Sequence, residues 1–203
     1  MANLSRQATG KILFIHGFGS CGTGNKAETL RQHFGKDRLV TPDLPVSPSH
    51  CIDILQKLIM EHQILATVSS SLGSFYATWL NRQFKLPAVL INPAVNPANT
   101  LRPHVGTHKH WCSGETFELT HDHIDQLDRL ARNRIDNDEQ YLVLLQEQDE
   151  VLDYRDAVRF YQGQQIIIEA GGNHRFENLD EYLTMIDHFI QQSSNHGINQ
   201  AGP

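Results

Sequence analysis

The sequence predicts an α/β fold built on a mostly parallel, six-stranded sheet with helices on both faces. Six short runs are apolar throughout and lack polar alternation, which is typical of strands buried on both faces. Segments with helical periodicity lie between most of these runs, and such alternation implies right-handed crossovers between parallel strands. The length of 203 residues suits one domain of this class.

The predicted elements are bounded by Gly, Pro, Asn or Asp, residues that favour turns. The strands are expected at 11–16, 38–44, 64–69, 87–92, 141–146 and 164–169. The helices are expected at 25–34, 49–62, 74–84, 153–161 and 179–191. The second helix shows the pattern well, because its apolar residues recur at helical spacing and mark one face: Ile52, Leu55, Leu58 and Ile59.

One connection is much longer than a crossover between parallel strands requires. Forty-eight residues separate Asn92 from Tyr141, and a structureless loop of that length is unusual inside a domain. The sequence therefore predicts a small cap or lid inserted at 93–140, with a helix of its own. Thr120 is the expected N-cap of this helix, and acidic residues follow in its first turns.

Composition and charge narrow the class of protein. Hydrophobic residues make up 39% and charged residues 20% of the chain, as in a folded globular protein. The net charge of −6 disfavours nucleic acid as a partner, because phosphate binding needs clustered Lys and Arg. No apolar run approaches the ~20 residues of a membrane span, and the N-terminus lacks the apolar core of a secretory signal. We expect a single domain over 1–192 and a disordered polar tail at 193–203.

The three cysteines predict a reducing environment. Cys21, Cys51 and Cys112 are odd in number, lie far apart and form no C-x-x-C motif. This pattern favours reduced thiols and a cytoplasmic location. Cys21 lies beside a glycine-rich loop, but no histidine or acid is placed to activate it, so we expect an inert thiol.

The segment SSSLG at 69–73 lies where the third predicted strand meets the next helix. Its small-x-Ser-x-Gly pattern is that of a nucleophile elbow, a strained turn that closes only with small residues two before and two after the serine. Ser71 is the central serine, Ser69 replaces the commoner glycine, and Gly73 follows. The alternative is that Ser70 or Ser71 is only a helix N-cap. The position directly after a buried strand favours Ser71 as a nucleophile.

A nucleophilic serine needs a general base and an acid that orients the base. His174 lies in the glycine-rich loop after the last predicted strand, where the base would come last in the order Ser, Asp, His. A solvated loop histidine is the alternative. Among the acids after the fifth strand, Asp149 sits at the turn itself and is preferred. Asp153 fits the first turn of the next helix, and Glu147 and Glu150 are less clearly aimed.

The loop HGFG at 16–19 follows the first predicted strand and supplies a candidate oxyanion hole. Acyl transfer needs backbone N–H groups aimed at the developing oxyanion, one from such a loop and one from the residue after the nucleophile. Phe18 and Leu72 occupy these places. His16 is expected to be a structural hydrogen-bonding residue beneath the loop. The spacing of the glycines and the lysine does not fit a phosphate-binding P-loop.

Aromatic residues on the helix after Ser71 are expected mostly in the core. Phe75, Tyr76 and Trp79 belong to this group. Phe75 and Tyr76, together with Phe18, are the candidate substrate-contacting residues.

The predicted cap is rich in histidine. Five of these residues could collect Zn²⁺ or Ni²⁺: His104, His108, His110, His121 and His123. Gly106 disfavours the helix that would bring the first two together, and apart from Cys112 no acid or thiolate ligand pattern accompanies them. We therefore predict no metal site and interpret these histidines as a solvated lid surface.

Five segments together resemble the small YqiA-like esterases of the α/β-hydrolase superfamily. They are ILFIHGFGS, SSSLGSFYATWL, LINPAVNP, QEQDEVLDYRDAV and GGNHRFEN. The similarity runs in order from about Lys11 to Ile190 and is weakest over 100–135. Ser69 and Ser74 depart from the pattern, because this family commonly has glycine at both positions.

The resemblance implies a trimmed α/β-hydrolase fold without the first strands of larger members. It implies a triad of Ser71, Asp149 and His174 and no metal or organic cofactor. It also implies a serine esterase that hydrolyses acyl esters through an acyl-enzyme intermediate, with acyl-CoA thioesters as a further candidate class. The partner is then a small-molecule ester or thioester, and the oligomeric state stays open.

Two alternative functions stay open beside the esterase. One is a catalytically weak binding or scaffold protein on the same fold, which fold alone does not exclude. The other is a metal-dependent hydrolase that uses the histidines of the cap. The presence of a complete Ser, Asp and His set argues against the scaffold.

Overall fold

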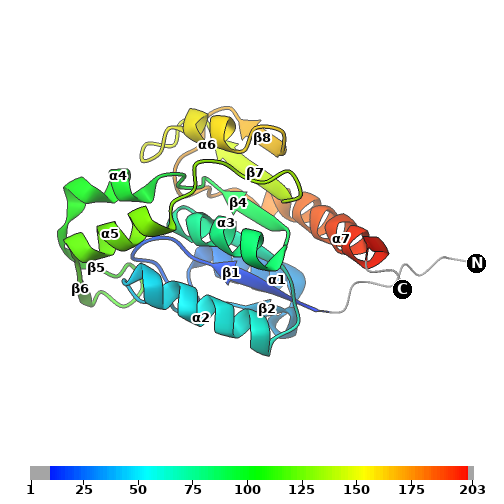
Figure 1. Ribbon diagram of the computed structural model, residues 1–203, viewed down its shortest axis with the longest axis horizontal. Helices are drawn as coiled ribbons and strands as arrows, with labels where there is room; N and C mark the ends of the chain where they lie inside the picture. The colour runs from blue at the N-terminus through cyan, green and yellow to red at the C-terminus, as the bar shows by residue number, and fades with distance from the viewer. Residues whose placement is uncertain (1–9, 201–203) are drawn as a thin grey trace, which may run out of the picture.

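The computed structural model describes residues 10–200, with the side chains of 10–194. Its centre is a six-stranded sheet of order β2-β1-β3-β4-β7-β8 in which every neighbouring pair is parallel (Figure 1). The strands are β1 (Lys11–Ile15), β2 (Leu39–Val40), β3 (Ile64–Ser70), β4 (Ala88–Ile91), β7 (Tyr141–Gln146) and β8 (Gln165–Glu169). The predicted fold class is confirmed.

The second strand is shorter than the predicted 38–44. Only Leu39 and Val40 pair with β1, at the edge of the sheet. Pro42 follows two residues later, and proline has no N–H to donate to the neighbouring strand. The chain therefore leaves the sheet early and continues into the loop before the next helix.

Helices cover both faces of the sheet. They are α1 (Asn25–Phe34), α2 (Pro48–Glu61), α3 (Leu72–Phe84), α6 (Tyr154–Phe160) and α7 (Leu183–Gln200), with short 3₁₀ turns η1 (Lys36–Arg38) and η3 (Leu179–Tyr182). Neighbouring residues of β1 point to opposite faces: Ile12 packs in the same cluster as residues of α1 and α7, and Leu13 packs with residues of α2 and α3. Burial on both faces explains why the strands read as continuous apolar runs.

The C-terminal segment differs from the expectation of a disordered tail over 193–203. Helix α7 continues to Gln200, and residues 201–203 lie outside the described residues, as do residues 1–9. Ile186 and Ile190 anchor the first half of α7 in the core. Once a helix is anchored in this way, each further residue adds a hydrogen bond at low entropic cost. Within the described residues, no helix combines the length and apolar character needed to cross a membrane.

The insertion between β4 and β7, for which the sequence predicts a cap, has secondary structure of its own and lies at one end of the molecule (Figure 1). It contains α4 (Pro97–Leu101), η2 (Arg102–His104), the antiparallel hairpin β5 (Gly106–Lys109) and β6 (Thr116–Leu119), and α5 (His121–Leu130). Thr120 is the N-cap of α5, as expected: its side chain accepts the N–H of His123, and the His123 ring accepts the N–H of Thr120. The hairpin was not predicted, because its two short strands are largely exposed and carry no continuous apolar run.

Candidate active site

Ser71 occupies the sharp turn between β3 and α3. Its backbone has φ 52° and ψ −123°, a combination that is costly for a residue with a side chain. Hydrogen bonds fix this conformation: the N–H of Ser71 donates to the carbonyl of Ile91 at 3.0 Å, and its carbonyl accepts the N–H groups of Ser74 and Ala94 at 3.0 and 3.1 Å. Ser71 stands at the N-cap position, but its side chain makes no capping hydrogen bond. The hydroxyl is therefore available for another role.

The small residues around Ser71 are required by close packing of the backbone. A Cβ added to Gly73 would lie 2.6 Å from the carbonyl oxygen of His16 and closer still to that of Ile15. Ser69 is buried, and its hydroxyl donates to the carbonyl of Val89 at 3.2 Å and contacts the Ser74 hydroxyl at 3.1 Å. Ser69 and Ser74, the two positions where the resembled family commonly has glycine, therefore hydrogen-bond to each other through their hydroxyls.

Three residues singled out from the sequence come together after the ends of β3, β7 and β8. The Nε2 atom of His174 lies 3.0 Å from Oγ of Ser71. Its Nδ1 atom lies 2.8 Å from Oδ2 and 3.0 Å from Oδ1 of Asp149. The Asp149 side chain is 2% exposed and that of His174 is 21% exposed. The carboxylate is thus sealed from water, whereas one edge of the imidazole can reach a ligand.

The loop after β7 fixes the Asp149 carboxylate. Oδ1 of Asp149 accepts the N–H groups of Val151 and Leu152 at 2.8 and 2.9 Å. Two neighbouring acids make hydrogen bonds elsewhere. Asp153 caps α6 by accepting the N–H of Arg155, as expected for the first turn of that helix. Glu147 accepts a hydrogen bond from the hydroxyl of Tyr154 at 3.3 Å.

Glu150 has a role that the sequence did not reveal. Its carboxylate accepts the backbone N–H of His174 at 2.9 Å, and this hydrogen bond lowers the pKa of Glu150. Glu150 therefore holds the backbone of the same histidine whose ring contacts Asp149.

Two buried amides, Asn92 and Gln146, also position the histidine loop and were missed from the sequence. Oδ1 of Asn92 accepts the N–H of Gln146 at 3.0 Å, and its Nδ2 donates to the carbonyl of Asn173 at 3.1 Å. Oε1 of Gln146 accepts the N–H of Asn173 at 2.9 Å. Both amides stand at the carboxyl end of a buried strand, where a polar residue is unusual; that was the available signal.

The glycine-rich loop after β1 lies against Ser71. A Cβ on Gly17 would come within 3.1 Å of Cβ of Ser71. Phe18 follows Gly17 in this loop, and Leu72 begins α3 directly after Ser71. Burial lowers the pKa of His16, which accepts the N–H of Leu44 at Nε2 and contacts the carbonyl of Gly17 through Nδ1. His16 therefore supports the loop as a neutral hydrogen-bonding residue, as expected.

A disulfide joins this loop to the cap and corrects the expectation of three reduced thiols. Cys21 is bonded to Cys112, 91 residues away in the sequence. The N–H of Trp111 donates to the carbonyl of Gly19 at 2.8 Å beside it. The pairing was missed because the sequence does not show that the tip of the hairpin meets the loop after β1. Because two of the three cysteines are paired, cysteine usage no longer supports the predicted cytoplasmic location.

The third cysteine, Cys51, is free and buried. Burial raises the pKa of its thiol to about 12, so this thiol stays protonated at neutral pH.

The hairpin closes over a small apolar cavity of about 20 Å³ beside the loop. Phe18, Leu72, Tyr76 and Phe117 are among its lining residues, and the rings of Phe18 and Phe117 meet edge to face at 5.3 Å. Phe75 lies elsewhere, in a separate crevice with Trp79. Two of the three candidate substrate contacts therefore share a cavity next to Ser71.

The histidines of the cap do not gather into a ligand set. In the described part of the chain, no group of three or more His, Cys, Asp or Glu side chains is placed to hold a metal ion. His108 and His110 pack against the Phe117 ring, and His123 belongs to the capping box of α5. Cys112, the thiol closest to them in the sequence, is bonded to Cys21.

The sheet order and the helices on both faces define the class: this is an α/β-hydrolase fold. Three solved structures are similar over most of their length. They are alpha/beta hydrolase domain-containing protein 10 from mouse (TM-score 0.72, 14% identity, 93% of this chain and 92% of that chain), the esterase domain of a Rhodothermus marinus protein (0.69, 14%, 93% and 89%) and a monoacylglycerol lipase from Paleococcus ferrophilus (0.66, 14%, 90% and 94%). At these identities the likeness concerns the fold.

Within this class, the chain belongs to the family described as "Uncharacterised protein family (UPF0227)", whose model matches residues 11–191. The match confirms the resemblance to the YqiA-like proteins that the sequence motifs indicated. It also includes the cap, where the motif resemblance was weakest.

Proposed function

We propose that the protein is a serine esterase that hydrolyses carboxylic acid esters through Ser71, His174 and Asp149. The observation that carries the proposal is the continuous chain of contacts across the imidazole: Nε2 to Oγ of Ser71 at 3.0 Å and Nδ1 to Oδ2 of Asp149 at 2.8 Å. The strained backbone of Ser71 supports it further, because such strain is retained mainly where it serves a function.

In the proposed mechanism, Asp149 accepts the Nδ1–H of His174 and leaves the lone pair of Nε2 facing the serine. Oγ of Ser71 attacks the ester carbonyl carbon while its proton moves to Nε2. The tetrahedral intermediate then breaks its bond to the alcohol oxygen, which leaves with that proton. Water attacks the acyl-enzyme with the same base, and the acid departs as Ser71 regains its proton.

The charge that develops on the carbonyl oxygen needs nearby donors. We assign this role to the N–H groups of Phe18 and Leu72. Leu72 begins α3, so the partial positive charge at the amino end of this 13-residue helix adds to the stabilisation. Because an N–H dipole interacts more strongly with a negatively charged oxygen than with a neutral carbonyl, these donors favour the anionic transition state over the bound ester.

Thioesters react through the same groups and are a second substrate class for this site. A scaffold function is less well supported, because a scaffold has no use for a buried carboxylate aligned with an imidazole and a serine. A metal-dependent hydrolysis is disfavoured by the other contacts of the histidines in the cap.

The proposal is tested with a fluorophosphonate probe, which labels activated serines, and with 4-nitrophenyl butyrate as substrate. Ser71→Ala should abolish labelling and lower kcat by several orders of magnitude, with the fold retained. Ser70→Ala is the matched control, because it removes the neighbouring hydroxyl, and it should keep most of the activity. Labelling that survives in Ser71→Ala, or a Ser70→Ala variant that is the inactive one, would contradict the assignment. EDTA should leave turnover unchanged.

A further inference from the structure

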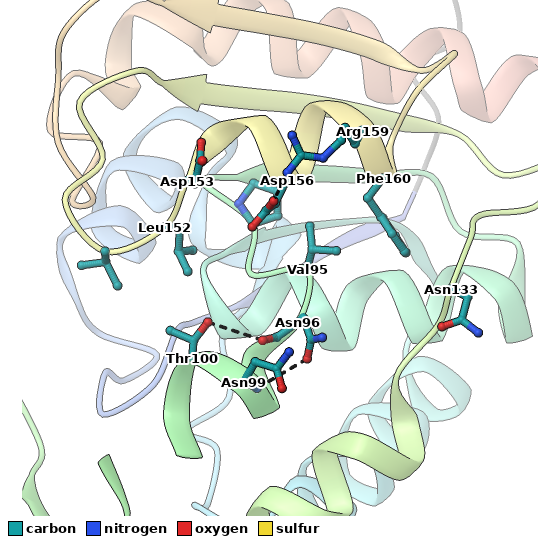
Figure 2. Close-up of a pocket in the computed structure, with 12 residues that line it drawn as sticks. Val95, Asn96, Asn99, Thr100, Asn133, Leu152, Asp153, Asp156, Arg159 and Phe160 are labelled. Carbon is teal, nitrogen blue, oxygen red and sulfur yellow. Dashed lines mark hydrogen bonds and ion pairs between the residues drawn. The ribbon is translucent and has the colours of Figure 1, made fainter. Parts of the chain in front are cut away.

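A second and much larger cavity, of about 590 Å³, opens between α4 and α6 (Figure 2). One wall is formed by residues between 93 and 100, where the chain leads from β4 into α4. The other is formed by residues between 151 and 160, where it leads from the loop after β7 into α6. Asn133, beyond the end of α5, also lines it. Its volume lies in the range of small-molecule binding sites, about 300–1,000 Å³. The mechanism above uses none of the residues that line it.

Residues in one wall of this cavity, and a residue next to the other wall, are hydrogen-bonded to the proposed catalytic residues. Val151 and Leu152 line the cavity and donate their N–H groups to Oδ1 of Asp149 at 2.8 and 2.9 Å. On the opposite wall, Pro93 and Val95 flank Ala94, whose N–H donates to the carbonyl of Ser71 at 3.1 Å. A molecule bound here would therefore lie against the two segments that fix Ser71 and Asp149.

In the order of the strands, the cavity lies on the same side of Ser71 as Asp149 and His174. The small apolar cavity lies toward β1, beside the loop that contains Phe18, whereas the large cavity lies toward β4 and β7. Asp149 follows β7 and His174 follows β8, on this second side. Because the histidine must protonate the departing alcohol, the alcohol part of the ester belongs on the side of His174 and the acyl part beside the oxyanion loop.

The lining of the large cavity combines apolar residues with uncharged polar side chains on the α4 side and charged side chains on the α6 side. On the α4 side, Asn96, Asn99 and Thr100 lie across the cavity from Asp153, Asp156 and Arg159 on the α6 side (Figure 2). Amides and a hydroxyl both donate and accept hydrogen bonds, as carbohydrate and glycerol hydroxyls do. Val95 and Phe160 add apolar surface, against which the C–H groups of a polyol can pack.

The charges in the cavity disfavour an anionic ligand. Among the described residues that line it, Arg159 is the single cation, and it is ion-paired with Asp156. Asp153 adds a second carboxylate to the lining, and its partner Arg155 does not line the cavity. A phosphate-bearing group such as coenzyme A would therefore meet two carboxylates and no unpaired arginine.

We propose that this cavity binds the alcohol part of the substrate and that this part is an uncharged polyhydroxylated group, such as glycerol or a hexose. The inference rests on the proposed esterase function and narrows its substrate class. It distinguishes esters of polyols from acyl-CoA thioesters, which share the same catalytic chemistry.

The test compares one acyl group on different leaving groups: ethyl butyrate, glycerol monobutyrate, glucose 6-butyrate and butyryl-CoA. We expect kcat/KM to be about tenfold higher for the glycerol or glucose ester than for ethyl butyrate, and lowest for butyryl-CoA. Two variants remove polar groups from separate walls with little change in volume: Asn99→Leu together with Thr100→Val on α4, and Asn133→Leu beyond α5. Each should lower kcat/KM for the polyol esters at least fivefold and leave ethyl butyrate within twofold.

Gln162→Leu is the matched control, because it places a leucine on the exposed surface just after α6 without lining the cavity. It should change none of the rates. Equal losses on ethyl butyrate and glucose butyrate in the cavity variants, no preference for polyol esters in the wild type, or a preference for butyryl-CoA would overturn the inference while the esterase function stands. Failure of the fluorophosphonate probe and of all four substrates would overturn both.

Discussion

The backbone N–H of His174 donates a hydrogen bond to the carboxylate of Glu150 at 2.9 Å, while the ring of the same histidine binds Asp149. Two consecutive acids thus hold one histidine at two points, one through its backbone and one through its side chain. The geometry of the imidazole toward Ser71 depends on both, since a shift of the loop would move Nε2 away from Oγ.

Replacing Glu150 should separate its hydrogen-bonding role from its charge. Glu150→Ala removes the acceptor for the N–H of His174 and should lower kcat/KM on 4-nitrophenyl butyrate by about three- to tenfold, the size of one exposed hydrogen bond. Glu150→Gln keeps an acceptor oxygen and should stay within twofold of the wild type. Kinetics at pH 7 with a thermal melt of each variant provide the measurement. A Glu150→Ala variant as active as the wild type would show that the loop is held without this contact.

Gly73 should tolerate no side chain. A Cβ at this position would enter the backbone carbonyls of Ile15 and His16, which cannot move without disturbing β1. We expect Gly73→Ala to destabilise the protein by about 3 kcal/mol or more, at the upper end of overpacking effects. Gly24→Ala is the control, because Gly24 has φ −67° and its nearest new contact is 3.5 Å. Urea unfolding of the two variants compares their free energies of unfolding directly. Equal values would show that the end of β1 can shift to accommodate a Cβ at position 73.

Much of the fold could be predicted because both faces of the sheet are covered. A strand that is buried on both faces is apolar throughout, as Tyr141–Gln146 largely is. Turn-favouring residues between such runs mark where each strand and helix begins and ends. The proposed catalytic residues could be placed for a related reason. In a parallel sheet the loops after the strands lie at one edge, and Ser71, Asp149 and His174 each follow one of three strands.

The parts that could not be predicted depend on contacts between distant segments. The hairpin carries no apolar run, and its position against the loop after β1 is set by tertiary contacts, so the pairing of Cys21 with Cys112 has no local signature. The roles of Asn92 and Gln146 likewise depend on the His174 loop, which reaches them only in the folded chain.

The disulfide should be visible as a count of thiols. Without reductant, alkylation of the unfolded chain should modify Cys51 alone, and after reduction it should modify all three cysteines. In the native protein Cys51 should resist alkylation, because burial raises the pKa of its thiol to about 12. Mass spectrometry gives the count, and three modified cysteines without reductant would contradict the bond.

Removing the bond should also cost stability. Cys112→Ser opens a loop of 91 residues, which should lower the free energy of unfolding by about 2–5 kcal/mol. Cys51→Ser is not a suitable control, since it places a hydroxyl in the core. The control is therefore wild-type protein unfolded with and without dithiothreitol, which should reproduce the difference. A melting temperature that does not respond to reductant would show that the bond adds no stability.

His16 should make the protein less stable as the pH falls. Burial lowers the pKa of His16 below the ordinary value of 6.5, so the unfolded chain takes up a proton at a higher pH than the folded chain does. The stability that neutral His16 contributes is fully present above about pH 6.5. It is lost as the pH falls toward the lowered pKa of the folded state, by at most about 1.4 kcal/mol of unfolding free energy per pH unit. Denaturant unfolding between pH 8 and pH 5 measures it. In His16→Gln the unfolding free energy should fall less with pH, because the variant lacks the imidazole that takes up a proton. Plots of unfolding free energy against pH that run parallel for the two proteins would contradict the role of His16.

Asp149→Asn should damage catalysis more than any other change of an acid after β7. If the amide oxygen keeps the N–H groups of Val151 and Leu152, the amide NH₂ faces Nδ1 of His174. Nδ1 must then accept rather than donate, which places the ring proton on Nε2, against Oγ of Ser71. The imidazole can no longer take the serine proton, so kcat should fall by a factor on the order of 10³–10⁴ with little loss of stability.

The neighbouring acids provide the controls for this prediction. Asp153→Asn keeps a capping oxygen for α6 and should leave kcat within about twofold, and so should Glu147→Gln, whose contact is to Tyr154. In the wild type, kcat/KM should rise with pH as the base becomes neutral, because only the neutral base can accept a proton. The rates are measured with 4-nitrophenyl butyrate from pH 5 to pH 8. If Asp153→Asn is as impaired as Asp149→Asn, the acid that orients the histidine is Asp153 and not Asp149. If kcat/KM does not change with pH, His174 is not the general base.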